Sequence, residues 1–147
     1  MIVIRLIVNV FFPLVIGVAI YLFLRCKSVF FIDIAENMFF MSLDKFRGYT
    51  CQKVVAADWI TNNLPDGLWV YSLTSLMLII WEDNLLDSYF WILSGLLVAF
   101  VSEFCQAVGI LPGRYDPIDM AFYILAFVVA CFNFSPIMFK NLERNRS

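Results

Sequence analysis

Long apolar runs alternate with short polar stretches along this chain. Four of the runs approach or exceed about 20 residues, the length that a helix needs to cross a bilayer. The predicted membrane-spanning helices are residues 2–24, 64–81, 89–111 and 119–139. The pattern therefore predicts an all-α integral membrane bundle of four transmembrane helices, formed by a single domain over residues 1–147.

One further apolar segment has a different pattern. Over residues 28–44 the apolar side chains recur near the helical period, with acidic residues such as Asp33, Glu36 and Asp44 between them. Three acids make a membrane crossing unfavourable. We therefore expect an amphipathic helix that lies in the membrane interface. The alternatives are a helix that packs over the mouth of the bundle and a fifth membrane-spanning helix.

The composition agrees with a bilayer as the solvent. Hydrophobic residues make up 63% of the 147 residues and charged residues 15%, against roughly 45–50% and 25% in soluble domains. Mean hydropathy is +0.86. The net charge of −2 and the lack of a basic run indicate no nucleic-acid partner. The chain has no histidine, which excludes Ser-His-Asp and Cys-His nucleophiles and histidine-ligated zinc.

Several polar residues near the ends of the predicted spans have ordinary interpretations. Arg5 lies close enough to the end of the first span to extend its guanidinium into the interface. Glu82, Asp83 and Asp87 are expected in a solvated turn. Pro13 is tolerated inside a membrane helix, where it can introduce a kink.

An even number of spans places both termini on one membrane face. The long loop before residue 64 and the turn at residues 112–117 then share the other face. Basic residues are slightly more frequent on that second face, which favours cytoplasmic loops under the positive-inside rule. The difference is small, so the orientation stays open, as do the number of spans and the oligomeric state.

Polar residues gather where the third and fourth predicted spans meet. Glu103 and Gln106 are three residues apart and share one side of a helix. Further apolar residues before Pro112 are expected to place this pair below the interface. A charge inside a bilayer costs at least about 2.5 kcal/mol, so such a residue usually faces the bundle interior and has a partner. We therefore expect Glu103 to point inward.

The predicted topology brings further polar residues to the same membrane face. Asp116 precedes Pro117 and can cap the fourth helix, and Asp119 then lies in its first turn, where the dipole favours an acid. Arg114 can serve as an anchor to lipid head groups. The candidate ligand-binding residues at this face are Asp66, Glu103, Gln106, Arg114, Asp116 and Asp119.

The spacing of these residues resembles the VanZ-like family of small polytopic membrane proteins. The matching positions are Glu103, Gln106, Arg114, Asp116 and Asp119. Family members often carry an asparagine where this chain has Tyr123. The resemblance implies a multi-pass protein of the bacterial inner membrane, in a family whose founding member is linked to resistance to a lipid-tailed glycopeptide antibiotic.

Several functions fit these residues. The first is binding of an amphiphile or lipid head group, with Arg114 meeting phosphate or carboxylate and the acids meeting amines, hydroxyls or a cation. The second is transport or ion coupling, with Glu103 carrying a proton or the acids and Gln106 holding Mg²⁺ or Ca²⁺. The third is an accessory subunit whose polar residues join helices.

An intramembrane enzyme is disfavoured, because the chain shows no recognisable nucleophile motif. No cofactor is implied beyond the candidate divalent cation. Membrane lipids are the expected partners, and a transporter of this size would need a homo-oligomer or a larger membrane complex.

Overall fold

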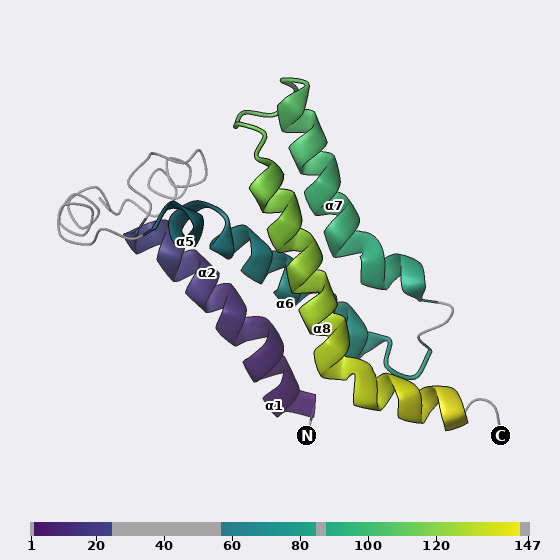
Figure 1. Ribbon diagram of the computed structural model, residues 1–147. Coiled ribbons are helices and arrows are strands. Elements are labelled where there is room, and N and C mark those ends of the chain that lie inside the picture. Colours follow the sequence, from purple (N-terminus) through teal and green to yellow (C-terminus); the bar gives the residue numbers. More distant parts are fainter. Residues whose placement is uncertain (1, 25–56, 85–87, 145–147) are drawn as a thin grey trace, which may run out of the picture.

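The computed structural model describes residues 2–24, 57–84 and 88–144. Every regular element in these ranges is a helix (Figure 1), so the predicted all-helical fold is confirmed for them. The expected helix at 28–44, interfacial or spanning, lies outside the described residues. The elements are α1 (Ile2–Leu6), the π-helical η1 (Ile7–Phe11), α2 (Phe12–Phe23), α5 (Asp58–Asn62), α6 (Leu64–Ile80), α7 (Tyr89–Ala107) and α8 (Pro117–Arg144).

Three helical stretches in the described ranges are long and apolar enough to cross a membrane: Ile2–Phe23, Tyr89–Ala107 and Pro117–Pro136. The first stretch agrees with the predicted span 2–24. α6 is also apolar; it begins where the span 64–81 was predicted to begin and ends one residue earlier, so it has 17 residues. That length is about 26 Å, slightly less than the roughly 30 Å of a bilayer core.

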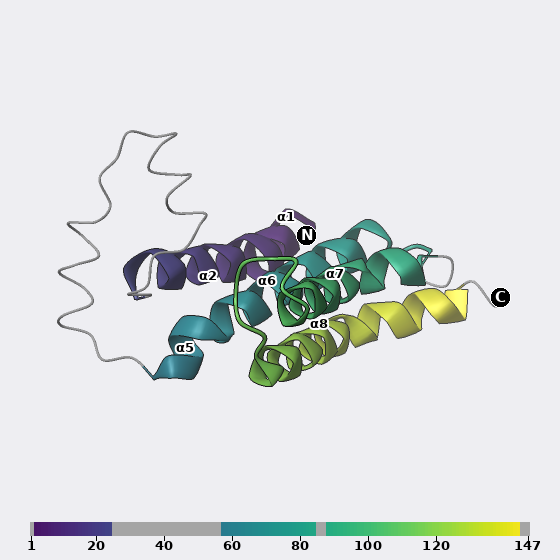
Figure 2. The ribbon, with the colours of Figure 1, turned by 90° about the horizontal axis from the view of Figure 1, so that it is seen from above.

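α6 is the central helix of the bundle. It contacts α2 and η1 on one side, α7 on another and α8 along its front face (Figures 1 and 2). Ser72, Thr74 and Ser75 of α6 are fully or almost fully buried, and small side chains let neighbouring helices approach closely. Both termini lie at the same end of the bundle (Figure 1).

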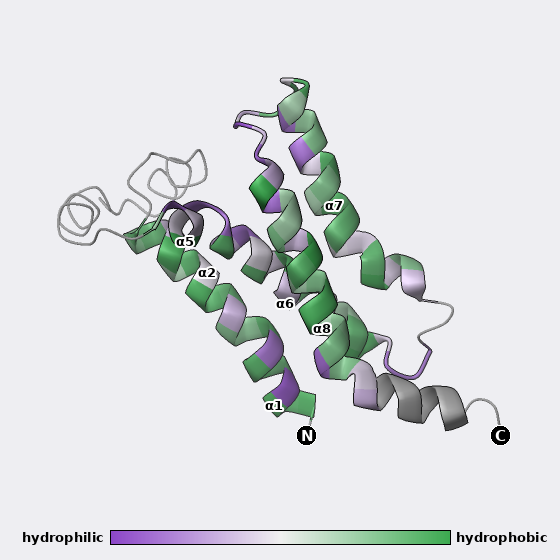
Figure 3. Ribbon diagram, in the orientation of Figure 1, coloured by the Kyte–Doolittle hydropathy of each residue, from purple (hydrophilic) through white to green (hydrophobic). Residues whose placement is uncertain are grey.

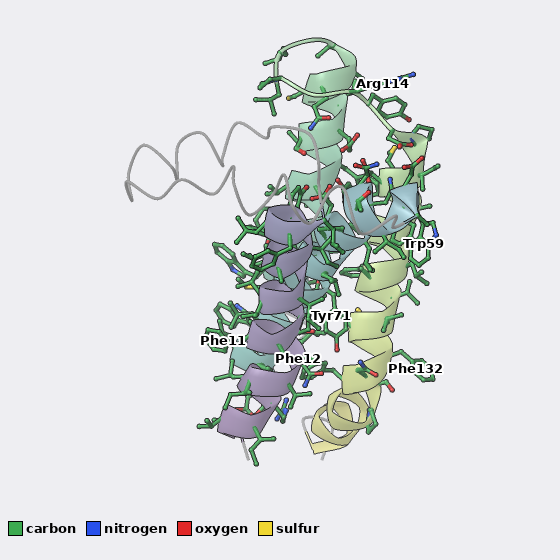
Figure 4. The ribbon with its side chains drawn as sticks, turned by 90° about the vertical axis from the view of Figure 1, so that its left-hand side faces the viewer. Phe11, Phe12, Trp59, Tyr71, Arg114 and Phe132 are labelled. Atoms are coloured by element: carbon green, nitrogen blue, oxygen red, sulfur yellow. The ribbon has the colours of Figure 1, made fainter. Side chains whose placement is uncertain are left out.

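The outer helices present apolar side chains to their surroundings. Hydrophobic residues dominate the middle of α2, α7 and α8, and hydrophilic residues gather in the loops and near the start of α6 (Figure 3). Phe11, Phe12 and Phe132 point outward (Figure 4), and Phe132 is 77% exposed. Such an apolar exterior is what a lipid solvent stabilises.

A hydrogen-bonded chain joins the N-terminal helix to α6 and α8. Pro13 has no amide hydrogen for the carbonyl of Asn9, and Asn9 lies in the π-helical turn η1, which ends two residues before Pro13. The Tyr71 hydroxyl donates to Asn9 Oδ1 at 2.9 Å and accepts from Asn133 Nδ2 at 2.9 Å. Figure 4 shows Tyr71 between the N-terminal helix and α8. The sequence pattern gave no expectation of this network.

The predicted end of the third span at residue 111 is wrong. α7 ends at Ala107, because Gly109 adopts a positive φ of 76° and closes a Schellman motif. Ile110 N–H donates to the Cys105 carbonyl at 2.8 Å, and Gly109 N–H donates to the Gln106 carbonyl at 3.1 Å. Gln106 consequently lies in the last turn of α7, and no further helical turn follows it.

The fourth helix is longer than the predicted 119–139. α8 begins at Pro117 and continues through Pro136 to Arg144, with a bend in its C-terminal part (Figure 1). Pro136 cannot donate to the carbonyl of Phe132. The Ser135 hydroxyl donates to that carbonyl at 2.8 Å instead, which is the substitution that lets proline persist in membrane helices.

The expected environments of Arg5 and Glu82 are also corrected. The two side chains form an ion pair, with Arg5 Nη2 and Glu82 Oε2 2.7 Å apart. The Arg5 guanidinium lies 5.2 Å from the centre of the Phe134 ring. The fold brings the end of α6 beside the start of the chain, so the half-buried Glu82 is paired with the half-buried Arg5. Asp87 lies outside the described residues.

Candidate functional site

Two helices begin at the same end of the bundle, and each carries an acid in its first turn. These acids are Asp66 in α6 and Asp119 in α8. The partial positive charge at a helix N-terminus stabilises a carboxylate there. Asn63, which is 4% exposed, donates from Nδ2 to Asp119 Oδ1 at 2.7 Å. This bond joins the starts of α6 and α8.

Glu103 of α7 lies inside the bundle. It is 3% exposed, and its Oε1 accepts from the Tyr123 hydroxyl of α8 at 3.1 Å. Its Oε2 accepts a longer bond of 3.4 Å from the backbone N–H of Asp116. A buried carboxylate needs such partners, because desolvation without them costs several kcal/mol. Glu103 therefore joins the end of α7 to the start of α8 through these hydrogen bonds.

The N-terminal helix reaches the same end of the molecule through Tyr21. Its hydroxyl donates to Asp66 Oδ1 at 2.6 Å. α2, α6, α7 and α8 thus all contribute polar side chains to one region.

Asp116 has the capping role that its position before Pro117 predicts. Its Oδ1 accepts from the backbone N–H of Ile118 at 2.9 Å, and its carbonyl accepts from the N–H of Asp119 at 3.1 Å. The cap orients the first turn of α8, and with it Asp119, toward the bundle.

Four carboxyl groups interact electrostatically at this end. The charges of Asp66, Glu103 and Asp116 all act on Asp119. The charges of Asp66, Glu103 and Asp119 also act on Tyr123. We call Asp66, Glu103, Asp116 and Asp119 the acidic cluster.

Two of the predicted site residues lie outside this cluster. Gln106 packs under the loop after α7, where a Cβ added to Gly113 would lie 2.7 Å from its side-chain amide. Arg114 is exposed on the same loop and extends away from the bundle (Figure 4). The structure therefore brings together Asp66, Glu103, Asp116 and Asp119, but neither Gln106 nor Arg114.

The acids are not arranged as a metal site. Within residues 2–24, 57–84 and 88–144, no group of three or more acidic or cysteine side chains could hold a metal ion. Mg²⁺ and Ca²⁺ require several oxygen ligands around one point. The divalent cation considered from the sequence has no preformed site in these ranges.

An apolar cavity of about 490 Å³ adjoins the acidic cluster. Residues of α6 line the base of the cavity. Residues of η1 and α2 line one side, and residues of α7 line the other. These helices lie on opposite sides of α6 (Figure 1). Asp66, Ser102 and Tyr123 line one end, and Val10, Leu76 and Gly95 line the other. Ten residues of α6 separate Asp66 from Leu76, which is about 15 Å along the helix.

Three residues of the site were missed by the sequence analysis: Tyr21, Asn63 and Tyr123. Tyr123 follows Asp119 by four residues, so the shared helix face was available as a signal. Asn63 directly precedes α6, but its bond to Asp119 depends on how two helices pack. Tyr21 carries no local signal, because its partner Asp66 is 45 positions away.

Comparison of the chain with protein-family models, with curated proteins and with solved structures finds no match. The resemblance to the VanZ-like family thus depends on the five matching positions alone. Three of these positions, Glu103, Asp116 and Asp119, lie together in the structure.

Proposed function

We propose that this chain is a membrane protein that binds an amphiphile, with the tail in the apolar cavity and the head group beside the acidic cluster. The observation that supports this most directly is the polarity of the cavity. Asp66 and Tyr123 line one end, and the remaining lining is almost entirely aliphatic, glycine or tryptophan apart from two serines. A ligand that matches this lining must itself be polar at one end and apolar along the rest.

The size of the cavity agrees with such a ligand. Small-molecule sites usually measure roughly 300–1,000 Å³ and are mostly apolar, with a few polar groups that fix orientation. A volume of about 490 Å³ lies within this range. The length of about 15 Å along α6 suits a hydrocarbon chain that lies alongside the helix, whereas a compact polar solute would leave most of the lining without contacts.

We also propose that α6 crosses the membrane, which makes four spans. Contacts at both ends of the first span support this. Tyr21 meets Asp66 at the start of α6, and Arg5 meets Glu82 just after its end. α6 is thus antiparallel to the first span over much of its depth. Its shortness is tolerable because protein surrounds it, so its ends need not match the bilayer.

The proposed location is the bacterial inner membrane, within the VanZ-like group. The support for this location is the resemblance to that family at Glu103, Asp116 and Asp119.

Native mass spectrometry with a matched pair of variants tests the binding proposal. Ala99 lines the cavity, whereas Ala121 of α8 is exposed on the outside. Ala99→Phe fills the cavity and is expected to weaken binding of dodecanol by about tenfold or more, equivalent to about 1.4 kcal/mol. Ala121→Phe adds the same side chain without entering the cavity and should bind like the unmodified protein.

Equal retention of dodecanol by both variants contradicts the proposal, as does purified protein that retains no amphiphile at all. Unfolding temperatures of both variants, measured in the same detergent, show whether Ala99→Phe has kept the fold.

A second function, that of an accessory subunit, is favoured by a different observation. Each acid outside the capping position accepts a hydrogen bond from a side chain outside its own helix: Asp66 from α2, Glu103 from α8 and Asp119 from the residue before α6. Such bonds stabilise packing between membrane helices by about 0.6 kcal/mol on average. Under this function the Ala99→Phe variant retains full activity in the assembled complex.

A further inference from the structure

We propose that the ligand is a two-chain lipid of the bilayer itself, which enters sideways between α2 and α7 and places one of its chains in the apolar cavity. This inference rests on the proposed function and specifies both the class of ligand and its route. It follows from the places where the lining of the cavity is exposed on the outside of the bundle.

The central helix is covered by its neighbours except at the cavity. The residues of α6 before Ile80 that are exposed are Trp69 and Leu73. They are four positions apart and share one face of the helix, and both line the cavity. Val98 of α7 also lines the cavity and is 66% exposed. The cavity is therefore a groove that opens to the outside of the bundle along this face.

Two glycines shape this opening. The Trp69 ring packs against Gly17 of α2, where an added Cβ would lie 3.2 Å from it. The Leu73 side chain packs against Gly95 of α7, where an added Cβ would lie 3.0 Å from it. The two side chains thus turn toward different helices, which flank α6 on opposite sides (Figure 1). The groove between α2 and α7 consequently stays open.

The opening lies at the depth of the hydrocarbon core. Leu73 comes nine residues after Leu64, the first residue of α6, which is about 14 Å along a helix of about 26 Å. With α6 across the membrane, this position is close to the bilayer centre, where lipid tails and not water surround the protein. A ligand that enters through this opening therefore comes from the lipid phase.

The inner end of the groove stops at packed side chains. Val10 lines the cavity and belongs to the hydrophobic core, and Leu76 lines the cavity and packs against that core. A hydrocarbon chain can therefore follow the groove for about 15 Å along α6 and no further. An enclosed pocket would have to hold the whole ligand, whereas an open groove holds one chain and leaves the second outside among lipid tails.

A pair of glycerol lipids tests the class of ligand. The full chain in detergent micelles is offered monolauroylglycerol and dilauroylglycerol in equal amounts, and bound species are counted by native mass spectrometry. We expect retention within about threefold of each other, because a second chain outside the groove exchanges one apolar environment for another. An enclosed pocket would be overpacked by the second chain, which would lower its retention about tenfold or more.

A matched pair of variants tests the route. Leu73→Trp places a larger side chain in the opening and is expected to lower retention of both lipids about tenfold or more, because it overfills the groove. Ile80→Trp makes a similar change at an exposed residue of the same helix that does not line the cavity, and it should retain both lipids like the unmodified protein. Unfolding temperatures in the same detergent show whether both variants keep the fold.

The outcomes distinguish this inference from the proposed function. Retention of monolauroylglycerol with loss of dilauroylglycerol overturns the two-chain ligand and leaves amphiphile binding intact. Equal retention by two folded variants, Leu73→Trp and Ile80→Trp, overturns the route between α2 and α7. A lipid-free dimer that Leu73→Trp dissociates assigns the groove to a second copy of the chain and overturns the inference. Retention of neither lipid by the unmodified protein overturns both the inference and the proposed function.

Discussion

Glu103 is a buried carboxylate whose unfavourable desolvation is offset by hydrogen bonds. The residue is 3% exposed, and a carboxylate so buried would be strongly unfavourable without partners; this one accepts bonds from Tyr123 and from the N–H of Asp116. Tyr123 in turn is 4% exposed and depends on Glu103 as the acceptor for its hydroxyl. The two side chains therefore stabilise each other's burial.

Substitution of Glu103 tests this mutual dependence. Glu103→Leu leaves the buried Tyr123 hydroxyl without its acceptor, and we expect a loss of about 1–3 kcal/mol in the free energy of unfolding. Glu103→Gln keeps an acceptor oxygen and should lose less than about 1 kcal/mol. Thermal or denaturant unfolding in detergent micelles measures both. Equal losses in the two variants would show that the hydrogen bond contributes nothing.

At the scale of the element, helix ends decide where the polar groups lie. α7 stops at Ala107 because Gly109 supplies the left-handed residue that a Schellman motif needs. α8 starts at Pro117 because Asp116 caps it. Together these two ends place Glu103 one turn from the end of its helix and opposite the first turn of α8, within reach of Tyr123.

Gly109→Ala tests the first of these helix ends. A Cβ at Gly109 meets nothing within 4 Å, so the cost is conformational alone. Holding alanine in a left-handed conformation costs roughly 1–2 kcal/mol, and we expect the unfolding free energy to fall by that amount. Gly109→Asn is the control, because asparagine tolerates this conformation and should lose less. An unchanged stability in Gly109→Ala would contradict the motif.

At the scale of the molecule, α6 decides both topology and site. It contacts every other described helix, carries the floor of the cavity and begins at the acidic cluster. Its buried hydroxyl residues Ser72, Thr74 and Ser75 let the surrounding helices approach. α2 and α7 are held apart by α6, and the cavity lies between them.

The number of spans has a direct test. If α6 crosses the membrane and residues 28–44 do not, the two termini lie on the same face and residue 114 lies on the other. Reporter fusions at each terminus, with labelling of Arg114→Cys in a chain whose four native cysteines are serine, give these three positions. Termini on opposite faces would contradict four spans and mean either three, with α6 failing to cross, or five, with residues 28–44 crossing as well.

Local patterns in the sequence determined a large part of this description. Apolar run length located the helices within a few residues, because a segment without water must satisfy its backbone internally as a helix. The cost of a charge in lipid predicted that Glu103 points inward, and Asp116–Pro117 predicted a cap. The end of α7 was misplaced because Gly109, a C-terminal cap signal, was counted as part of the apolar run.

Contacts between helices were decided only by the tertiary structure. Tyr21 with Asp66, Asn63 with Asp119, and Arg5 with Glu82 join positions 45, 56 and 77 residues apart, and no periodicity within one helix encodes which faces will meet. The same holds for the outward direction of Arg114 and for the cavity. Sequence determined which segments are helices and which polar groups need partners, whereas packing around α6 chose those partners, because helix rotation and depth depend on all the neighbouring side chains together.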